Sequence, residues 1–82
     1  MQDVHIKTPT QLTAALRSLR RAQALSQSEF GRKIGLSQER ISAIENRPER
    51  VTMDQLLTVL MALGVDLVIK SRTPEADSPG TW

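Results

Sequence analysis

The chain has 82 residues, a length that allows one domain with a small hydrophobic core. It contains no cysteine, which excludes disulfides, thiolate zinc sites and a cysteine nucleophile, and which fits a reducing cytoplasm. No stretch approaches the roughly 18 apolar residues of a membrane span, and the first residues lack the basic start and apolar run of a signal peptide. We therefore expect a soluble cytoplasmic protein with no membrane partner.

Charge is distributed unevenly along the chain. The formal net charge is +2, and both Glu75 and Asp77 lie in a final segment that carries no base. Between residues 17 and 50, arginine and lysine clearly outnumber the acidic residues. This excess suits a polyanionic partner such as nucleic acid, although an ordinary solvated surface has the same composition.

Capping signals mark the starts of four helices. In a capping box, a Ser or Thr cap is followed three residues later by Glu or Gln, and the two side chains satisfy two backbone donors. Such boxes occur as Thr8 with Gln11, Ser26 with Glu29 and Thr52 with Gln55. Ser37 indicates a further start. Together with the apolar spacing, these signals predict helices over residues 9–24, 27–34, 38–46 and 53–63.

Apolar residues at helical spacing define the buried face of each predicted helix. The residues expected to be buried include Leu12, Ala15, Leu16, Leu19, Phe30, Ile41, Ile44, Leu56, Leu57, Leu60 and Leu63. In the first helix we expect Arg17, Arg20 and Arg21 to point largely away from this core. The pattern predicts an all-α fold, a compact domain of four to five helices.

The spacing of the apolar residues changes from helical to alternating after Gly64. Val65, Leu67 and Ile69 alternate with other residues over 65–70 in the manner of a short β-strand. A single strand cannot satisfy its own backbone, and residues 4–6 are the only internal candidate for pairing. We therefore predict that this strand pairs with its copy in a homodimer, through an interface that contains Val65, Leu67, Val68 and Ile69. Residues 1–72 would form one folded domain that carries this interface, and 73–82 a flexible polar tail.

The second and third predicted helices have the layout of a DNA-binding helix-turn-helix. Only Gly35, Leu36 and Ser37 separate them, and Gly35 is suited to the left-handed conformation that closes a helix. In such a unit the first helix crosses the phosphate backbone and the second enters the major groove. The segment from Ser37 to Asn46 is then the candidate recognition helix, and residues 1–72 would form a helix-turn-helix domain for DNA binding and dimerisation.

Polar residues on this segment and around it are candidates for two kinds of DNA contact. The candidates for reading base edges are Ser37, Gln38, Glu39, Arg40 and Ser42. The candidates for binding phosphate are Gln27, Ser28, Arg32, Lys33 and Arg47. Each of these taken singly could also be an ordinary solvated side chain, and we expect Glu45 to be an internal hydrogen-bond or salt-bridge partner.

Arg40 stands where a capping box would have Glu or Gln. It places positive charge at the positive end of the helix dipole, where a carboxylate would be favoured by roughly 0.3 to 1 kcal/mol. A residue that is unfavourable for the helix itself indicates a functional role. Here a DNA phosphate or the edge of a guanine would supply the negative partner of Arg40. The alternative is an exposed arginine paired with Glu39 or Glu49.

The same residues resemble a known family. Gln27, Gly31, Gly35, Ser37 and the Ile41-Ser42-x-x-Glu45 pattern are similar to the Xre or lambda-repressor-like regulators. The Thr-Pro-Thr-Gln-Leu opening, the predicted strand and a tail that contains Trp82 resemble the HipB-type antitoxins. Gly31 departs from the family, whose members have Ala there, a difference that would keep the close contact between helices.

The resemblance implies a function and partners. It implies a repressor that binds double-stranded operator DNA, regulates its own operon and holds a HipA-like serine/threonine kinase toxin inactive. The two-fold symmetry of the predicted homodimer separately predicts an operator that is an inverted repeat. Trp82 would be an anchor in a pocket of that toxin, and the alternative is a frayed terminus without a role. A free-standing Xre-family repressor without a toxin is the alternative for the whole chain.

The sequence offers little support for an enzyme. His5 is the only histidine and lies outside any metal-ligand spacing, so we expect no metal site. No serine lies in a nucleophile elbow, and the glycines form neither a phosphate-binding loop nor a dinucleotide fingerprint. We therefore expect no catalysis and no cofactor.

Overall fold

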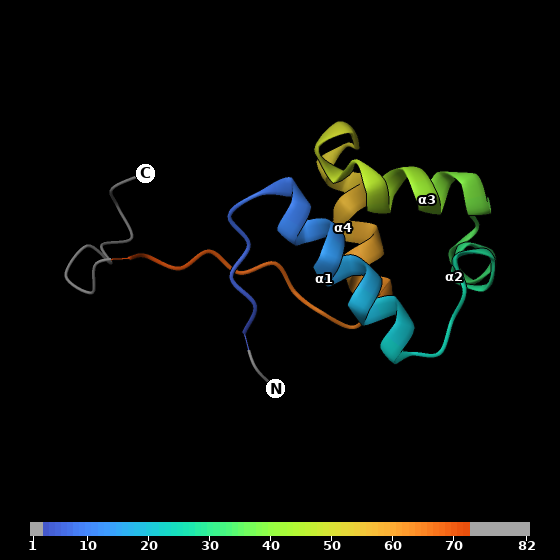
Figure 1. The fold of residues 1–82 in the computed structure, drawn as a ribbon, viewed down its shortest axis with the longest axis horizontal. Helices are drawn as coiled ribbons and strands as arrows, with labels where there is room; N and C mark the ends of the chain where they lie inside the picture. Colours follow the sequence, from blue (N-terminus) through green and yellow to red (C-terminus); the bar gives the residue numbers. More distant parts are fainter. Residues whose placement is uncertain (1–2, 73–82) are drawn as a thin grey trace.

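The computed structural model describes residues 3–72 (Figure 1). Its elements are α1 (Pro9–Ala22), α2 (Gln27–Ile34), α3 (Gln38–Asn46), a 3-10 turn η1 (Pro48–Arg50) and α4 (Met53–Ala62). The all-helical class is confirmed, and within residues 3–72 there is no β-strand. Residues 65–70 have no regular structure in the single chain, so the predicted pairing between copies stays a prediction. The predicted tail at 73–82, including Trp82, lies outside the described residues.

Every α-helix begins at the predicted cap. In each case the cap hydroxyl accepts a hydrogen bond from the backbone N–H three residues later, at Thr8, Ser26, Ser37 and Thr52. The return bond of a capping box, however, forms only in α2, where Ser26 N donates to Glu29 Oε1 at 2.8 Å. Gln11 instead accepts from Lys7 N at 2.5 Å, and Gln55 accepts from a side chain of α3. The prediction of complete boxes in α1 and α4 was therefore wrong.

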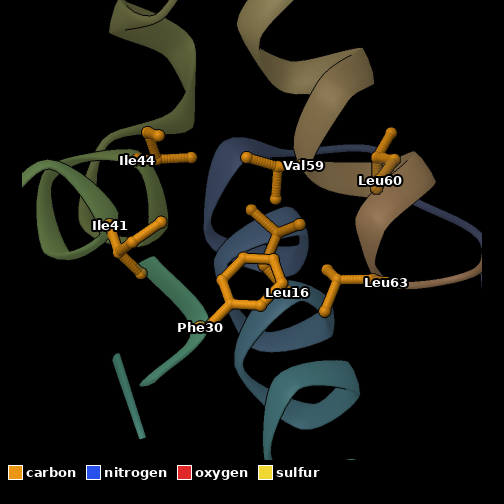
Figure 2. Close-up of a cluster of buried hydrophobic side chains, with 7 residues drawn as sticks. All are labelled: Leu16, Phe30, Ile41, Ile44, Val59, Leu60 and Leu63. Atoms are coloured by element: carbon orange, nitrogen blue, oxygen red, sulfur yellow. The ribbon is translucent and has the colours of Figure 1, made fainter. Parts of the chain in front are cut away.

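The core lies where α1 meets the other helices. Figure 2 shows Leu16, Phe30, Ile41, Ile44, Val59, Leu60 and Leu63, which converge from all four α-helices. Burial of each such side chain stabilises the fold by roughly 1.5 to 3 kcal/mol. Leu57 was expected in this core, but it is 36% exposed. In α4 the inward stripe runs through residues 56, 59, 60 and 63 and leaves residue 57 beside it.

Gly31 lies at the closest approach between α2 and the turn that follows it. A Cβ atom at this position would lie 2.4 Å from the carbonyl oxygen of Leu36 and 3.1 Å from Cγ1 of Ile41. The first distance is too short for non-bonded atoms, and the oxygen belongs to backbone. Glycine therefore keeps the close contact at this position, as expected from the sequence, whereas Ala would force the turn to move.

The two extended ends of the domain lie next to each other. Lys70 Nζ is 2.5 Å from Asp3 Oδ2, and Figure 1 shows the segment before α1 crossing the segment after α4. Both partners of this ion pair are largely exposed, so solvent screens the attraction and the pair contributes little to stability. None of the helices within residues 3–72 is long and apolar enough to span a bilayer.

Candidate nucleic-acid interface

The turn between α2 and α3 fixes the angle between the two helices. Gly35 ends α2 in the left-handed conformation, with φ of 78°. Leu36 N donates to Gly31 O at 2.7 Å, and the Leu36 side chain is packed against the core. Ser37 then caps α3 through its bond from Arg40 N. These local bonds set α3 across α2 at one edge of the domain (Figure 1).

A buried carboxylate holds the back of α3. Glu45 is 3% exposed, and its Oε2 accepts from Arg20 Nε at 2.6 Å. Its Oε1 accepts from Arg20 Nη2 at 3.2 Å and from Gln27 Nε2 at 3.0 Å. The prediction that Glu45 is an internal partner is therefore confirmed. This one side chain connects α1, α2 and α3.

Arg20 is a second residue that sequence reasoning placed wrongly. It was expected to point away from the core, but it is 7% exposed and also donates from Nη1 to Leu25 O at 2.8 Å. The available signal was its spacing, because Arg20 follows Leu16 by four residues and shares its helical face. Glu45 follows Ile41 by the same interval. Opposite charges at buried positions of two helices predict an ion pair, and this spacing could have revealed it.

Asn46 is a further residue that the sequence did not single out. It lies at the last position of α3, where its Oδ1 accepts from Arg17 Nη2 and its Nδ2 donates to Ser42 Oγ at 3.2 Å. These bonds fasten the end of α3 to α1. They also occupy part of the hydrogen-bonding capacity of Ser42, which is half-buried.

The outward side of α3 is polar and accessible. Among the predicted base-reading residues, Ser37, Gln38, Glu39 and Arg40 are exposed, and Ser42 is half-buried. Ala43 is also exposed and lies one turn after Glu39, on the same face. A methyl group there could contact the methyl group of thymine, and sequence reasoning missed this candidate because it considered polar residues only.

Arg40 has a partner that sequence reasoning did not consider. Its Nη2 donates to Gln55 Oε1 in the first turn of α4, whereas the alternatives considered from the sequence were Glu39 and Glu49. Among residues 3–72 no carboxylate lies within ion-pair distance of Arg40. The Arg40 guanidinium is therefore held by a neutral amide, that of Gln55.

The predicted phosphate-binding residues lie in two kinds of surroundings. Arg32, Lys33 and Arg47 are exposed at the ends of α2 and α3. Gln27 and Ser28 are half-buried at the start of α2, and the Gln27 amide donates one hydrogen to Glu45. Gln27 keeps its backbone N–H and a second amide hydrogen for an external acceptor.

The start of α2 also carries a perturbed carboxylate. Hydrogen bonds from the backbone and side chain of Ser26 lower the pKa of Glu29 from its ordinary value of 4.5. Glu29 is therefore an anion near the positive end of the α2 dipole, which it stabilises. This charge belongs to the cap and lies on the helix that is expected to cross the phosphate backbone.

Comparison with known proteins identifies the family. The sequence profile of the helix-turn-helix family matches residues 16–69. The chain is also 34% identical over 74 residues to the antitoxin HipB of Escherichia coli K12, an alignment that covers 87% of this chain and 84% of that protein. The chain belongs to the HipB antitoxin branch of the helix-turn-helix family.

Solved structures of HipB have the same fold. A HipB–O4 20-mer complex matches with a TM-score of 0.75 and 31% identity, and covers 87% of this chain and all of that one. A HipA–HipB–O2–O3 complex matches with a TM-score of 0.76, also at 31% identity and with the same coverage. The family resemblance inferred from the sequence is therefore confirmed.

Proposed function

We propose that this chain is a DNA-binding transcriptional repressor and antitoxin of the HipB type. One observation carries the proposal: the buried residues Ile41, Ile44 and Glu45 fix α3 from behind, while its other side presents exposed polar groups. A rigid helix with a polar outward face is what readout in the major groove requires. The HipB complexes named above support the same function. The chain acts by binding in the cytoplasm, without catalysis or a cofactor.

Readout and positioning are assigned to different residues. Ser37, Gln38, Glu39, Arg40 and Ser42 are proposed to meet base edges. Gln27, Ser28, Arg32, Lys33 and Arg47 are proposed to bind phosphates and to fix the orientation of α3. Phosphate contacts set the affinity and the register, whereas base contacts discriminate between sequences.

A homodimer is the proposed functional unit. Leu67, Val68 and Ile69 are 56%, 66% and 79% exposed in the single chain, which leaves an apolar segment uncovered. In α4, Met53, Leu57 and Met61 form a further exposed stripe at a spacing of four residues. We propose that residues 65–70, with Val65 at their start, pair with the same segment of a second copy, and that the α4 stripe is covered with them. A two-fold axis would then require an inverted-repeat operator with half-sites about 34 to 36 Å apart or a multiple of that.

A HipA-like serine/threonine kinase is the proposed protein partner. The HipA–HipB–O2–O3 complex supports this assignment, because HipA occurs there with a protein 31% identical to this chain. Trp82 lies outside the described residues and is proposed as an anchor for the kinase. Deletion of Trp82 should weaken binding to the kinase and leave DNA affinity unchanged. Unchanged affinity for the kinase would contradict the anchor role of Trp82. If the unmodified chain bound no such kinase, the alternative of a free-standing repressor would be supported.

DNA binding can be tested with a randomised pool of duplexes, which contains the operator whatever its sequence. The pool is selected on the protein, and the affinity of the selected duplex is measured by fluorescence anisotropy. For a dimer making roughly 6 to 10 phosphate contacts, affinity should fall by about 10³ to 10⁵-fold between about 50 and 200 mM salt. A nearly flat salt response, or selection of no sequence, would contradict the proposal.

A further inference from the structure

Gln55 occupies a capping position but does not serve as a cap. It is the third residue of α4, three positions after the cap Thr52, and its backbone N–H donates to Thr52 Oγ1 at 3.1 Å. The same position in α2 is held by Glu29, whose side chain returns the bond to its cap at 2.8 Å. The Gln55 side chain instead reaches across to α3 and accepts from Arg40.

The counterpart of Gln55 in α1 makes the contrast clear. Gln11 also follows a threonine cap by three residues, and its side chain oxygen accepts from the backbone of Lys7, next to its own helix start. Two glutamines in equivalent positions therefore have different tasks. Gln11 orders the entry into its own helix, whereas Gln55 is committed to a side chain of the candidate recognition helix.

Gln55 can hold the Arg40 guanidinium in place and still leave its charge available for DNA. An amide oxygen accepts from the guanidinium and orients it, but it carries no charge that would neutralise it. A carboxylate in the same place would form an ion pair and reduce the attraction of Arg40 for DNA. Because no carboxylate within residues 3–72 pairs with Arg40, its full charge remains available.

We propose that Gln55 is a positioning residue for sequence readout: it holds the Arg40 guanidinium on the α3 side of α4 and thereby determines which base pair Arg40 reads. This inference rests on the proposed role of Arg40 in DNA binding. An arginine that is oriented before binding loses less rotamer freedom when the complex forms. A tethered guanidinium also reaches fewer alternative acceptors, so it discriminates more sharply between base pairs.

The test compares variants on duplexes selected from a randomised pool by the unmodified protein. Affinities are measured for the selected duplex and for its single base-pair changes, with Arg40→Ala, Gln55→Met, the double variant and Gln11→Met. Gln55→Met keeps the length and helix propensity of the side chain but removes the acceptor. Gln11→Met is the matched control, because it makes the same change at the same position of another helix.

We expect Gln55→Met to lower discrimination about two- to tenfold, only at the base pairs whose discrimination Arg40→Ala also lowers. In the Arg40→Ala background, Gln55→Met should have no further effect. Gln11→Met should leave discrimination unchanged. Circular dichroism during thermal unfolding separates the positioning role from a general loss of stability, which would weaken binding to all duplexes alike.

Several results would overturn the positioning role. One is an unchanged discrimination profile in Gln55→Met while Arg40→Ala alters it, and another is an equal loss in both backgrounds. A third is a uniform loss of affinity for every duplex. If Arg40→Ala itself leaves discrimination unchanged, the readout role of Arg40 and the inference built on it both fail. Failure of the unmodified protein to select any sequence would instead contradict the proposed function.

Discussion

Arg20 and Glu45 form a buried ion pair, with Arg20 Nε 2.6 Å from Glu45 Oε2, that joins α1 to α3, the candidate recognition helix. The pair has further hydrogen bonds from Gln27 and to Leu25 O, and within residues 3–72 no buried side-chain nitrogen or oxygen lacks a partner. Each member of the pair needs the other, because separating them would leave a buried charge uncompensated. The pair therefore fixes the position of α1 relative to α3. It makes the position of α3 depend on α1 and α2 together.

Removal of one partner of this pair should destabilise the domain strongly. We expect Glu45→Ala to lower the free energy of unfolding by about 3 to 5 kcal/mol, since it strands the buried Arg20 and the amide of Gln27. Urea denaturation followed by circular dichroism measures this change. Lys70→Met removes the exposed pair with Asp3, which solvent screens, and should lower the free energy of unfolding far less. Equal effects of the two changes would contradict the structural role of the buried pair.

Base reading and phosphate binding should respond differently to mutation. Gln38→Ala should reduce discrimination at particular base pairs by about 1 to 3 kcal/mol, because the amide is proposed to read a base edge. Lys33→Ala should weaken binding to all duplexes alike and reduce the salt dependence by about one phosphate contact. Affinities for a selected duplex and its single base-pair changes distinguish these outcomes. The division of roles fails if both variants give the same profile.

A charge placed in the apolar segment after α4 should disrupt the proposed dimer. Ile69 is 79% exposed in the single chain, so Ile69→Asp has little effect on the fold of one copy, but it puts charge into the proposed interface. We expect monomers in sedimentation analysis and a large loss of DNA affinity. Asp66→Lys is the control in the same segment, on the other side of the alternation, and should remain dimeric. A dimer that survives Ile69→Asp would indicate a different interface.

The cap of α2 predicts a dependence of stability on pH. Because the pKa of Glu29 is lowered in the folded protein, its contribution is fully present above about pH 4.5, the ordinary value. The contribution is lost as the pH falls through the lowered folded pKa. In Glu29→Gln the neutral amide can keep the bond from Ser26 N, so stability should decline less steeply on acidification. Denaturation curves at a series of pH values below neutral test this, and identical pH profiles would contradict it.

Local sequence signals predicted the helices well, because their causes are local. The hydroxyl caps at Thr8, Ser26, Ser37 and Thr52 need only the backbone three residues ahead, and Gly35 needs only its own freedom to adopt a positive φ. The apolar spacing likewise defined the buried side of α3 through Ile41 and Ile44. For the same reason the recognition segment and its exposed polar residues could be located from the sequence.

The tertiary structure alone decided which polar side chains meet across helices. Arg20 with Glu45, and Arg40 with Gln55, each join residues far apart in the chain, and only the packing of the helices brings them within bonding distance. The same sequence pattern at Gln11 and Gln55 led to two different partners, because a side chain takes whichever donor the fold places beside it. Helix boundaries follow from forces that act along the chain, whereas the hydrogen-bond network behind α3 depends on distances that exist only after folding.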